Sequence, residues 1–221
     1  MIQGTNGNDT LTLKSGLKLI SSSGNDTLTG NGPGYQLNKT HTQVNADFAK
    51  GTIAKYQGTS SYGIDTLSGT GFSKFINSTA STKATIYSSL DNDMAFELKQ
   101  GNVDFYSNVK TSNTIQTDNA ALTLHYEKFT DSITLDNNTV TKTDGKTDTF
   151  TTAAVINGTD YGDSYNIIDV NTTEGLGLNY NQSLTINAGK GSDSFRFTHI
   201  HNELTINAVT NHNDNSDSYY I

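Results

Sequence analysis

Short runs of alternating apolar and polar residues recur along the whole chain. Every second residue is apolar in residues 94–98, which begin at Met94, and residues 122–124 alternate in the same way. Side chains of a β-strand point alternately to the two faces of a sheet, so this period of two predicts strands with one buried face. The sequence has no convincing amphipathic-helix pattern, and its Thr, Tyr, Phe, Ile and Val content favours strands. The chain is therefore predicted to be all-β.

A short turn motif recurs between the alternating runs. It consists of Gly or another small residue, any residue, Asp, Thr or Ser, and an apolar residue, and its two clearest copies contain Asp9 and Asp26. Each repeated unit is too small to bury an apolar face by itself, so the repetition predicts units that stack on one another. More degenerate copies contain Asp65, Asp148, Asp163, Asp193 and Asp217.

Longer repeats support the same organisation. The pentapeptide at residues 184–188 returns unchanged at residues 204–208, and residues 44–79 are similar to residues 133–159. Units stacked coil upon coil share one continuous core, which favours a parallel β-solenoid. An antiparallel β-sandwich also has many short strands separated by turns, and it is the alternative fold.

The turn motif supplies the oxygen atoms that calcium binds. Glycine allows a tight loop whose backbone carbonyls can turn toward one point, and the Asp that follows adds a carboxylate. Ca²⁺ takes oxygen ligands at about 2.3–2.6 Å. The candidate metal-binding positions are Asn6, Gly7, Asp9, Gly24, Asp26, Asp65, Asp163, Gly191 and Asp193.

The same Asp residues have a second possible role. A turn Asp can accept a hydrogen bond from the backbone close to it, with no metal involved. Calcium is the preferred interpretation for Asp9 and Asp26, and the two roles are balanced for Asp163 and Asp193. A turn role is preferred for Asp65, Asp148 and Asp217, although Asp65 stays among the candidate ligands.

One copy of the motif carries a family resemblance. Residues 4–12, Gly4-Thr5-Asn6-Gly7-Asn8-Asp9-Thr10-Leu11-Thr12, resemble the Gly-Gly-x-Gly-x-Asp-x-apolar-x nonapeptide of haemolysin-type (RTX) calcium-binding proteins. In that family two nonapeptides form one coil of a right-handed parallel β-roll. The resemblance implies RTX-like β-roll turns in residues 1–34 and degenerate solenoid repeats in residues 35–221, continuous with the first. It also implies a calcium cofactor, type I secretion and an extracellular or cell-surface location.

Composition narrows the classes of function. The net charge is -8 and Arg196 is the only arginine, which argues against nucleic-acid binding. The absence of cysteine excludes disulfides and thiolate metal sites. No apolar run is long enough to cross a membrane. Because the first residues lack a signal-peptide pattern, we expect export without one or excision from a longer chain.

These observations together lead us to expect an extracellular, calcium-binding structural or interaction protein that is not an enzyme. It would form a segment of a surface layer, adhesin or matrix fibre, and it would associate with itself or with repeats of a parent protein. One alternative is a polysaccharide-binding accessory module of a β-helix epimerase or lyase. The other is such an enzyme itself, with Arg196, His199 and a nearby Tyr as cation, base and acid. His199 and His201 share one face of a strand and are more simply explained as surface or half-buried residues, so no catalytic residue is assigned.

Overall fold

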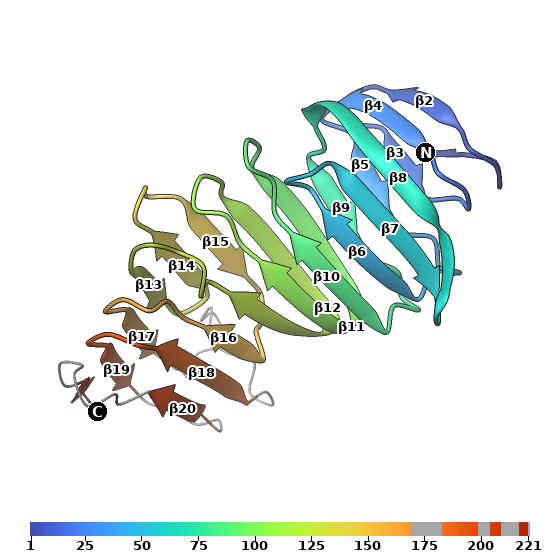
Figure 1. Ribbon diagram of the computed structural model, residues 1–221. Coiled ribbons are helices and arrows are strands. Elements are labelled where there is room, and N and C mark those ends of the chain that lie inside the picture. The colour runs from blue at the N-terminus through green and yellow to red at the C-terminus, as the bar shows by residue number, and fades with distance from the viewer. Residues whose placement is uncertain (169–182, 199–203, 209–216, 221) are drawn as a thin grey trace. The chain divides into compact units, whose positions relative to one another are not determined.

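The computed structural model describes residues 1–168, 183–198, 204–208 and 217–220 (Figure 1). All regular elements in these residues are β-strands of one large mixed sheet that is not closed, so the all-β prediction is confirmed. The chain divides into two compact units, residues 1–121 and 122–221, and residues 34 and 35 both lie in the first. The strands are β1 (Ile2–Gln3), β2 (Thr10–Leu13), β3 (Lys18–Ile20), β4 (Thr27–Asn31), β5 (Gly34–Gln36), β6 (Gln43–Asp47), β7 (Thr52–Gln57), β8 (Ser60–Gly71), β9 (Lys74–Ile76), β10 (Lys83–Tyr87), β11 (Met94–Tyr106), β12 (Asn113–His125), β13 (Ile133–Asp136), β14 (Thr139–Lys142), β15 (Thr147–Phe150), β16 (Val155–Asn157), β17 (Ser164–Ile168), β18 (Leu184–Gly189), β19 (Ser194–Thr198), β20 (Leu204–Ala208) and β21 (Ser218–Tyr220).

Parallel strands in register build the core of the first unit. The strands β1, β3, β5, β9 and β11 pair side by side, as do β2, β4 and β8. Alternate side chains of a strand share a face of the sheet. Residues that are paired across neighbouring strands therefore form a row on one face, which points either inward or outward. The inward row through the first set consists of Ile2, Leu19, Tyr35, Phe75 and Phe96, of which all but Ile2 are buried.

The alternating segment at residues 94–98 belongs to β11, as its period predicted. Met94, Phe96 and Leu98 are at most 4% exposed, whereas the residues between them are only partly buried. The strand continues to Tyr106 and pairs in parallel with β9 and β10. The sequence period therefore identified both the strand and its buried face.

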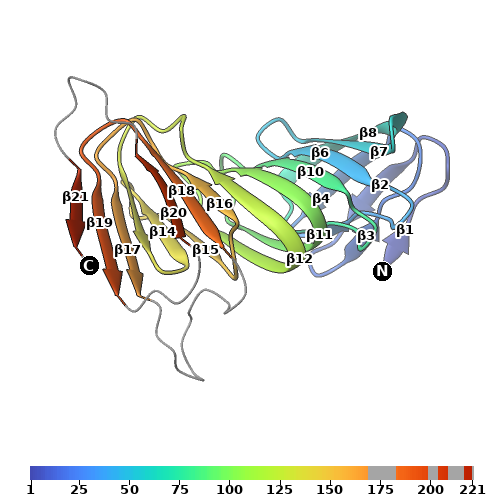
Figure 2. The same cartoon turned by 90° about the horizontal axis from the view of Figure 1, so that it is seen from below.

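Parallel strands also build the second unit. The strands β13, β17, β19 and β21 form one in-register set, and β16, β18 and β20 form another with the end of β12 (Figure 2). The two identical pentapeptides are β18 and β20, which pair residue for residue from Leu184↔Leu204 to Asn187↔Asn207. Tyr165, Phe195 and Tyr219 stack with ring centroids 5.1 Å and 5.0 Å apart. Identical residues in adjacent strands thus stack on their own equivalents.

Antiparallel pairing is found in two three-stranded meanders. The first is β6–β7–β8 in the first unit, and the second is β13–β14–β15 in the second unit. They lie in the two long segments that the sequence showed to be similar. Parallel pairs connect most of the remaining strands, so the repeats stack with their equivalent residues aligned.

Close approach of neighbouring repeats restricts several glycine positions, and Gly63 is one of them. Gly63 in β8 has φ +114°, and a Cβ atom there would lie 2.0 Å from the Gly24 carbonyl oxygen. Gly58 also has a positive φ, +58°, but nothing lies within 4 Å of a Cβ placed on it. Substitution of Gly58 would therefore introduce backbone strain alone, whereas substitution of Gly63 would add a steric clash.

We expect Gly63→Ala to lower the free energy of unfolding by at least ~3 kcal/mol, because it adds a backbone clash to an unfavourable φ. Gly58→Ala should cost only about 1 kcal/mol, since its φ lies in the left-handed helical region. Urea unfolding of both variants measures the difference. Equal losses would contradict the close packing of these turns.

Candidate functional site

The Asp residues of the turn motif form a column in the first unit. Asp9 and Asp26 precede β2 and β4, and Asp65 lies at the equivalent position in β8, so the register of these strands aligns the three. The backbone N–H of Asp9 donates to Asp26 Oδ1 at 3.0 Å, and the backbone N–H of Asp26 donates to Asp65 Oδ1 at 3.2 Å. The carboxylates of Asp26 and Asp65 thereby each join their own repeat to the repeat before it.

The carboxylates of Asp9 and Asp26 are also bound within their own turns. The backbone N–H of Thr5 donates to Asp9 Oδ2 at 2.6 Å, and the Ser22 hydroxyl donates to Asp26 Oδ2 at 3.0 Å. A Cβ atom at Gly4 would lie 2.6 Å from Asp9 Oδ2, so glycine leaves room for this carboxylate. The repeated sequence motif is therefore a repeated hydrogen-bond motif.

A buried lysine ammonium group lies in the middle of this column. Lys55 comes from β7 and is 0% exposed. Its Nζ donates to the carbonyl oxygens of Ser22, at 2.8 Å, and Gly24, at 3.1 Å. It also forms an ion pair with Asp65 Oδ1 and lies 3.7 Å from Asp26 Oδ2. Two backbone carbonyls and two carboxylates thus converge on one cation, which is the lysine itself.

Burial shifts the pKa values of the groups around Lys55. Burial raises the pKa of Asp65, and the hydrogen bonds from Lys55 and Tyr35 partly oppose that rise. The Tyr35 hydroxyl donates to Asp65 Oδ2 at 2.6 Å, and burial together with the Asp65 charge holds its pKa well above the usual range. Burial, with a contribution from the Lys55 charge, lowers the pKa of His41 to about 4. At neutral pH Tyr35 is therefore a protonated donor and His41 is uncharged.

A second Asp column runs through the second unit. The backbone N–H of Asp163 donates to Asp193 Oδ1 at 2.8 Å, and that of Asp193 donates to Asp217 Oδ1 at 3.0 Å. Thr159 donates to Asp163 from both its backbone N–H and its hydroxyl, each at 2.8 Å. Thr159 and Asp163 are separated as Thr5 and Asp9 are. The same local motif therefore recurs in the second unit. Burial raises the pKa of the Asp163 carboxyl group.

The second meander repeats the buried lysine. Lys142 in β14 donates to Asp148 Oδ1 at 2.7 Å, and both side chains are 0% exposed. The Tyr126 hydroxyl donates to Asp148 Oδ2 at 3.0 Å, as Tyr35 does to Asp65. Burial and the Asp148 charge raise the pKa of Tyr126 well above its usual range. Each unit thus holds one Lys–Asp–Tyr cluster, contributed in part by the middle strand of its meander.

The predicted ligand positions divide between the two units. Asp9, Asp26, Gly24 and Asp65 lie together in the first, with Gly7 stacked on Gly24, and Asn6 is exposed in the first turn. Asp163, Asp193 and Gly191 lie in the second. Asp65 and Asp148 are buried strand residues, not members of tight turns. His199 and His201 lie outside the described residues.

Sequence reasoning missed Lys55 and Lys142, although a signal was present. Lys55 lies two residues after Ile53 and Lys142 two residues after Val140, and both apolar residues are 0% exposed. A period of two therefore places both lysines on the buried face. A buried lysine needs an acidic partner, which the motif copies at Asp65 and Asp148 provide.

Two comparisons with known proteins found no match. No protein-family model matches the chain, and no curated protein matches it. Within the described residues, His, Asp and Glu side chains do not gather in groups of three or more that could hold a metal ion. Those residues also contain no helix long and apolar enough to cross a membrane.

We expect Lys55→Met to lower the free energy of unfolding by about 3–5 kcal/mol, because it leaves Asp65 and Asp26 buried without their cation. Lys50→Met is the matched control, since the Lys50 side chain is 80% exposed, and its change should stay within about 0.5 kcal/mol. Adding Asp65→Asn to Lys55→Met should recover part of the loss. Urea unfolding at neutral pH measures all three, and a Lys55→Met protein as stable as the control would contradict this account.

Proposed function

We propose that this chain is a structural and interaction protein, built as a parallel β-solenoid, that extends by pairing its end strands with further copies of itself. The observation that carries the proposal is the in-register parallel stacking of equivalent residues in both units. In such an arrangement each strand presents the next one with the same hydrogen-bonding edge. The haemolysin-type motif makes an extracellular location part of this proposal, and the proposal assigns no catalytic role.

The N-terminal edge strand has main-chain groups suited to this pairing. β2 pairs with β4, and the backbone N–H of Thr27 donates to the Asp9 carbonyl at 2.8 Å. In a parallel ladder alternate residues direct their main-chain groups to opposite sides of the strand. The main-chain N–H and C=O groups of Leu11 and Leu13 therefore point toward β4. Those of Thr10 and Thr12 point to the opposite side of β2. An unpaired row of this kind is a template for another strand.

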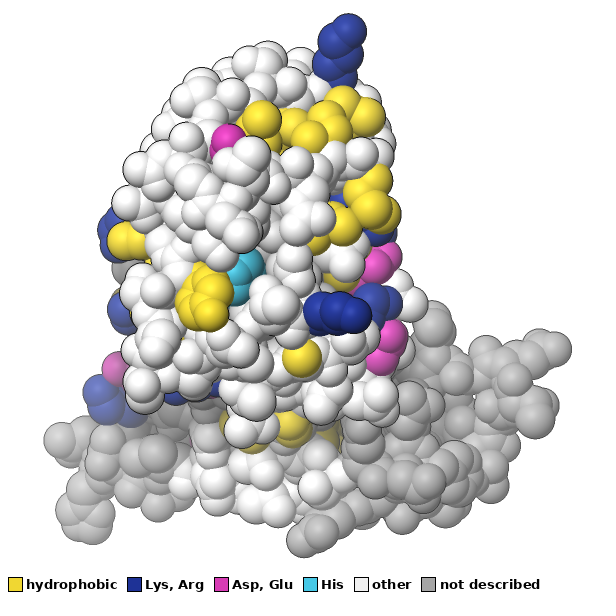
Figure 3. Space-filling model, turned by 90° about the vertical axis from the view of Figure 1, so that its right-hand side faces the viewer, with side chains coloured by type: hydrophobic (Ala, Val, Ile, Leu, Met, Phe, Trp, Pro, Cys, Tyr) yellow, Lys and Arg dark blue, Asp and Glu magenta, His cyan; other side chains and the backbone are white. Residues whose placement is uncertain are grey.

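The edge strand at this end carries no charge of its own to oppose association. Figure 3 looks onto the N-terminal side of the first unit, where groups of hydrophobic side chains lie among uncharged surface and separate groups of basic and acidic side chains. Met1 is 74% exposed and Leu11 is only partly buried. Charged residues are the usual protection of an exposed strand edge, and β2 itself contains none.

Thr12→Pro tests the edge directly. Proline removes the N–H that points away from β4 and leaves the bonds to β4 intact, so it should reduce self-association without unfolding the chain. Sedimentation velocity over a range of protein concentrations should show larger species for the unmodified chain and fewer for the variant. Ser15→Pro, in the exposed turn that follows β2, is the control. A chain that stays monomeric at all concentrations would refute extension by edge pairing.

Calcium binding is a second proposal, confined to the first turn. In the second turn the carbonyls of Ser22 and Gly24 and the carboxylate of Asp26 surround the Lys55 ammonium group. The in-register equivalents in the first turn are Thr5, Gly7 and Asp9. This oxygen set fits a hard cation, and none of the Lys55 contacts reaches it. The lysine supports the proposal because, in the second turn, the same three positions direct their oxygen atoms toward a cation.

We expect removal of Ca²⁺ with EGTA to lower the melting temperature and added Ca²⁺ to restore it. Each kcal/mol of binding free energy corresponds to about 2–4 °C for a chain of this size. Asp9→Asn should abolish the calcium-dependent shift, and Asp91→Asn, which removes an exposed charge of the same unit, should preserve it. A melting temperature that does not change across millimolar Ca²⁺ would contradict the proposal.

A further inference from the structure

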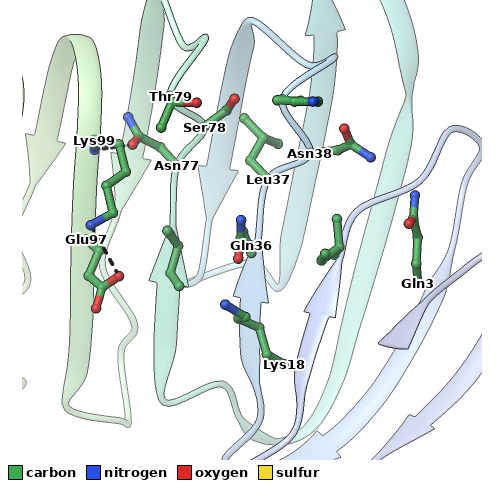
Figure 4. Close-up of a pocket in the computed structure, with 13 residues that line it drawn as sticks. Gln3, Lys18, Gln36, Leu37, Asn38, Asn77, Ser78, Thr79, Glu97 and Lys99 are labelled. Atoms are coloured by element: carbon green, nitrogen blue, oxygen red, sulfur yellow. Dashed lines mark hydrogen bonds and ion pairs between the residues drawn. The ribbon is translucent and has the colours of Figure 1, made fainter. Parts of the chain in front are cut away.

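The outward face of the first unit contains a polar groove that the structural role does not use. The groove has a volume of about 530 Å³ and lies over β1, β3, β5, β9 and β11 (Figure 4). Parallel pairing aligns one row of outward residues across these strands, so that polar and apolar side chains alternate along it. From β1 to β11 the row is Gln3, Ile20, Gln36, Ile76 and Glu97.

The row combines an apolar floor with amide groups. Ile20 and Ile76 lie between the amides, and Ile76 is 6% exposed, so the floor is part of the folded core. Neighbouring strands are about 4.7–4.9 Å apart, which places Gln3 and Gln36 roughly 10 Å from each other. Asn38 adds a third amide at one end of the groove (Figure 4). Amides at a regular spacing can bond the hydroxyl groups of a repeating polymer, and the partly exposed Ile20 side chain can contact the apolar face of a sugar ring.

The groove is positively charged in a chain whose net charge is -8. Its lining includes Lys18, Lys39 and Lys99, against Glu97. Glu97 already forms ion pairs with Lys74 and with Lys99, and the Lys74 hydrogen bond is the main reason that its pKa is lowered. Lys99 is also paired with Asp118, so Lys18 and Lys39 provide the excess positive charge that a ligand would meet.

Lys18 provides the central cation of the groove. Its side chain is partly buried, and within the described residues it forms no ion pair and no hydrogen bond. Figure 4 shows Lys18 and Gln36 near the middle of the groove, between Gln3 on one side and Glu97 on the other. A half-buried ammonium group without an acidic neighbour is suited to an anionic ligand.

We propose that this groove binds an acidic polysaccharide, with Lys18 pairing a uronate carboxylate and Gln3 and Gln36 bonding sugar hydroxyls. The alternation of amide and isoleucine fits a sugar chain better than a nucleic acid, because nucleic-acid binding depends on clustered cations and the groove has no aromatic side chain to stack on bases. The proposal does not depend on self-association or on calcium.

Isothermal titration calorimetry with a galacturonate hexamer tests the proposal. The matched probe is the same hexamer after reduction of its carboxylates to alcohols. We expect the acidic hexamer to bind at least tenfold more tightly than the reduced one, because the reduced hexamer lacks the charged hydrogen bond to Lys18. The affinity of the acidic hexamer should also fall with added salt, because salt screens the charges. Equal affinity for the two probes, or no binding of either at millimolar concentration, would overturn the proposal.

Variants locate the site. Lys18→Met should weaken binding of the acidic hexamer by about tenfold and leave the reduced hexamer unaffected. Gln36→Leu should weaken both probes alike, because the hydroxyl groups are common to them. Lys14→Met removes an exposed lysine outside the groove and should change neither. Circular dichroism shows whether each variant is folded. Binding that is unchanged in folded Lys18→Met, or tighter binding of a single-stranded oligonucleotide than of the acidic hexamer, would refute the assignment.

Discussion

The first unit depends on the neutralisation of the carboxylates that its repeats bury. Asp65 is 0% exposed and Asp26 is 2% exposed, so each would be strongly destabilising without a donor or a cation. Lys55 provides that cation from β7, and its ammonium group also bonds two backbone carbonyls of the turn. This single group connects the meander β6–β7–β8 to the turn that precedes β4. A buried ion pair of this type is costly to break, and its geometry holds the two elements in one arrangement.

The second unit reaches the same arrangement with different spacing. Lys142 and Asp148 lie on neighbouring antiparallel strands, as Lys55 and Asp65 do, and a tyrosine donates to the Asp in each case. Tyr35 lies in β5, and Tyr126 directly follows β12. The lysine and aspartate are ten residues apart in the first unit and six in the second. What the two units share is therefore the position of the charges in the sheet and not their separation in the chain.

The two faces of the strands carry separate tasks. Inward rows of leucine, phenylalanine and tyrosine, with the Asp columns at the turns, hold the repeats together. Outward rows leave their residues available for contact with other molecules, and the parallel register gathers them into continuous lines. Gln3, Ile20 and Gln36 come from three different repeats, yet they form one surface because their strands are aligned. Binding surfaces on such a fold arise from register more than from local motifs.

The sequence by itself determined the all-β class, the strand at residues 94–98 and the repetition of the Asp turns. These are local properties, because a period of two and a glycine-containing turn act within a few residues. The partners of the carboxylates were decided by the tertiary structure. Lys55 is 33 residues from the Ser22 carbonyl that it bonds, and no local pattern indicates that contact. The alternation of apolar and polar residues around Lys55 indicates that its side chain faces inward. Only the alignment of distant strands shows that its ammonium group lies among the turn oxygen atoms, where a metal ion was expected.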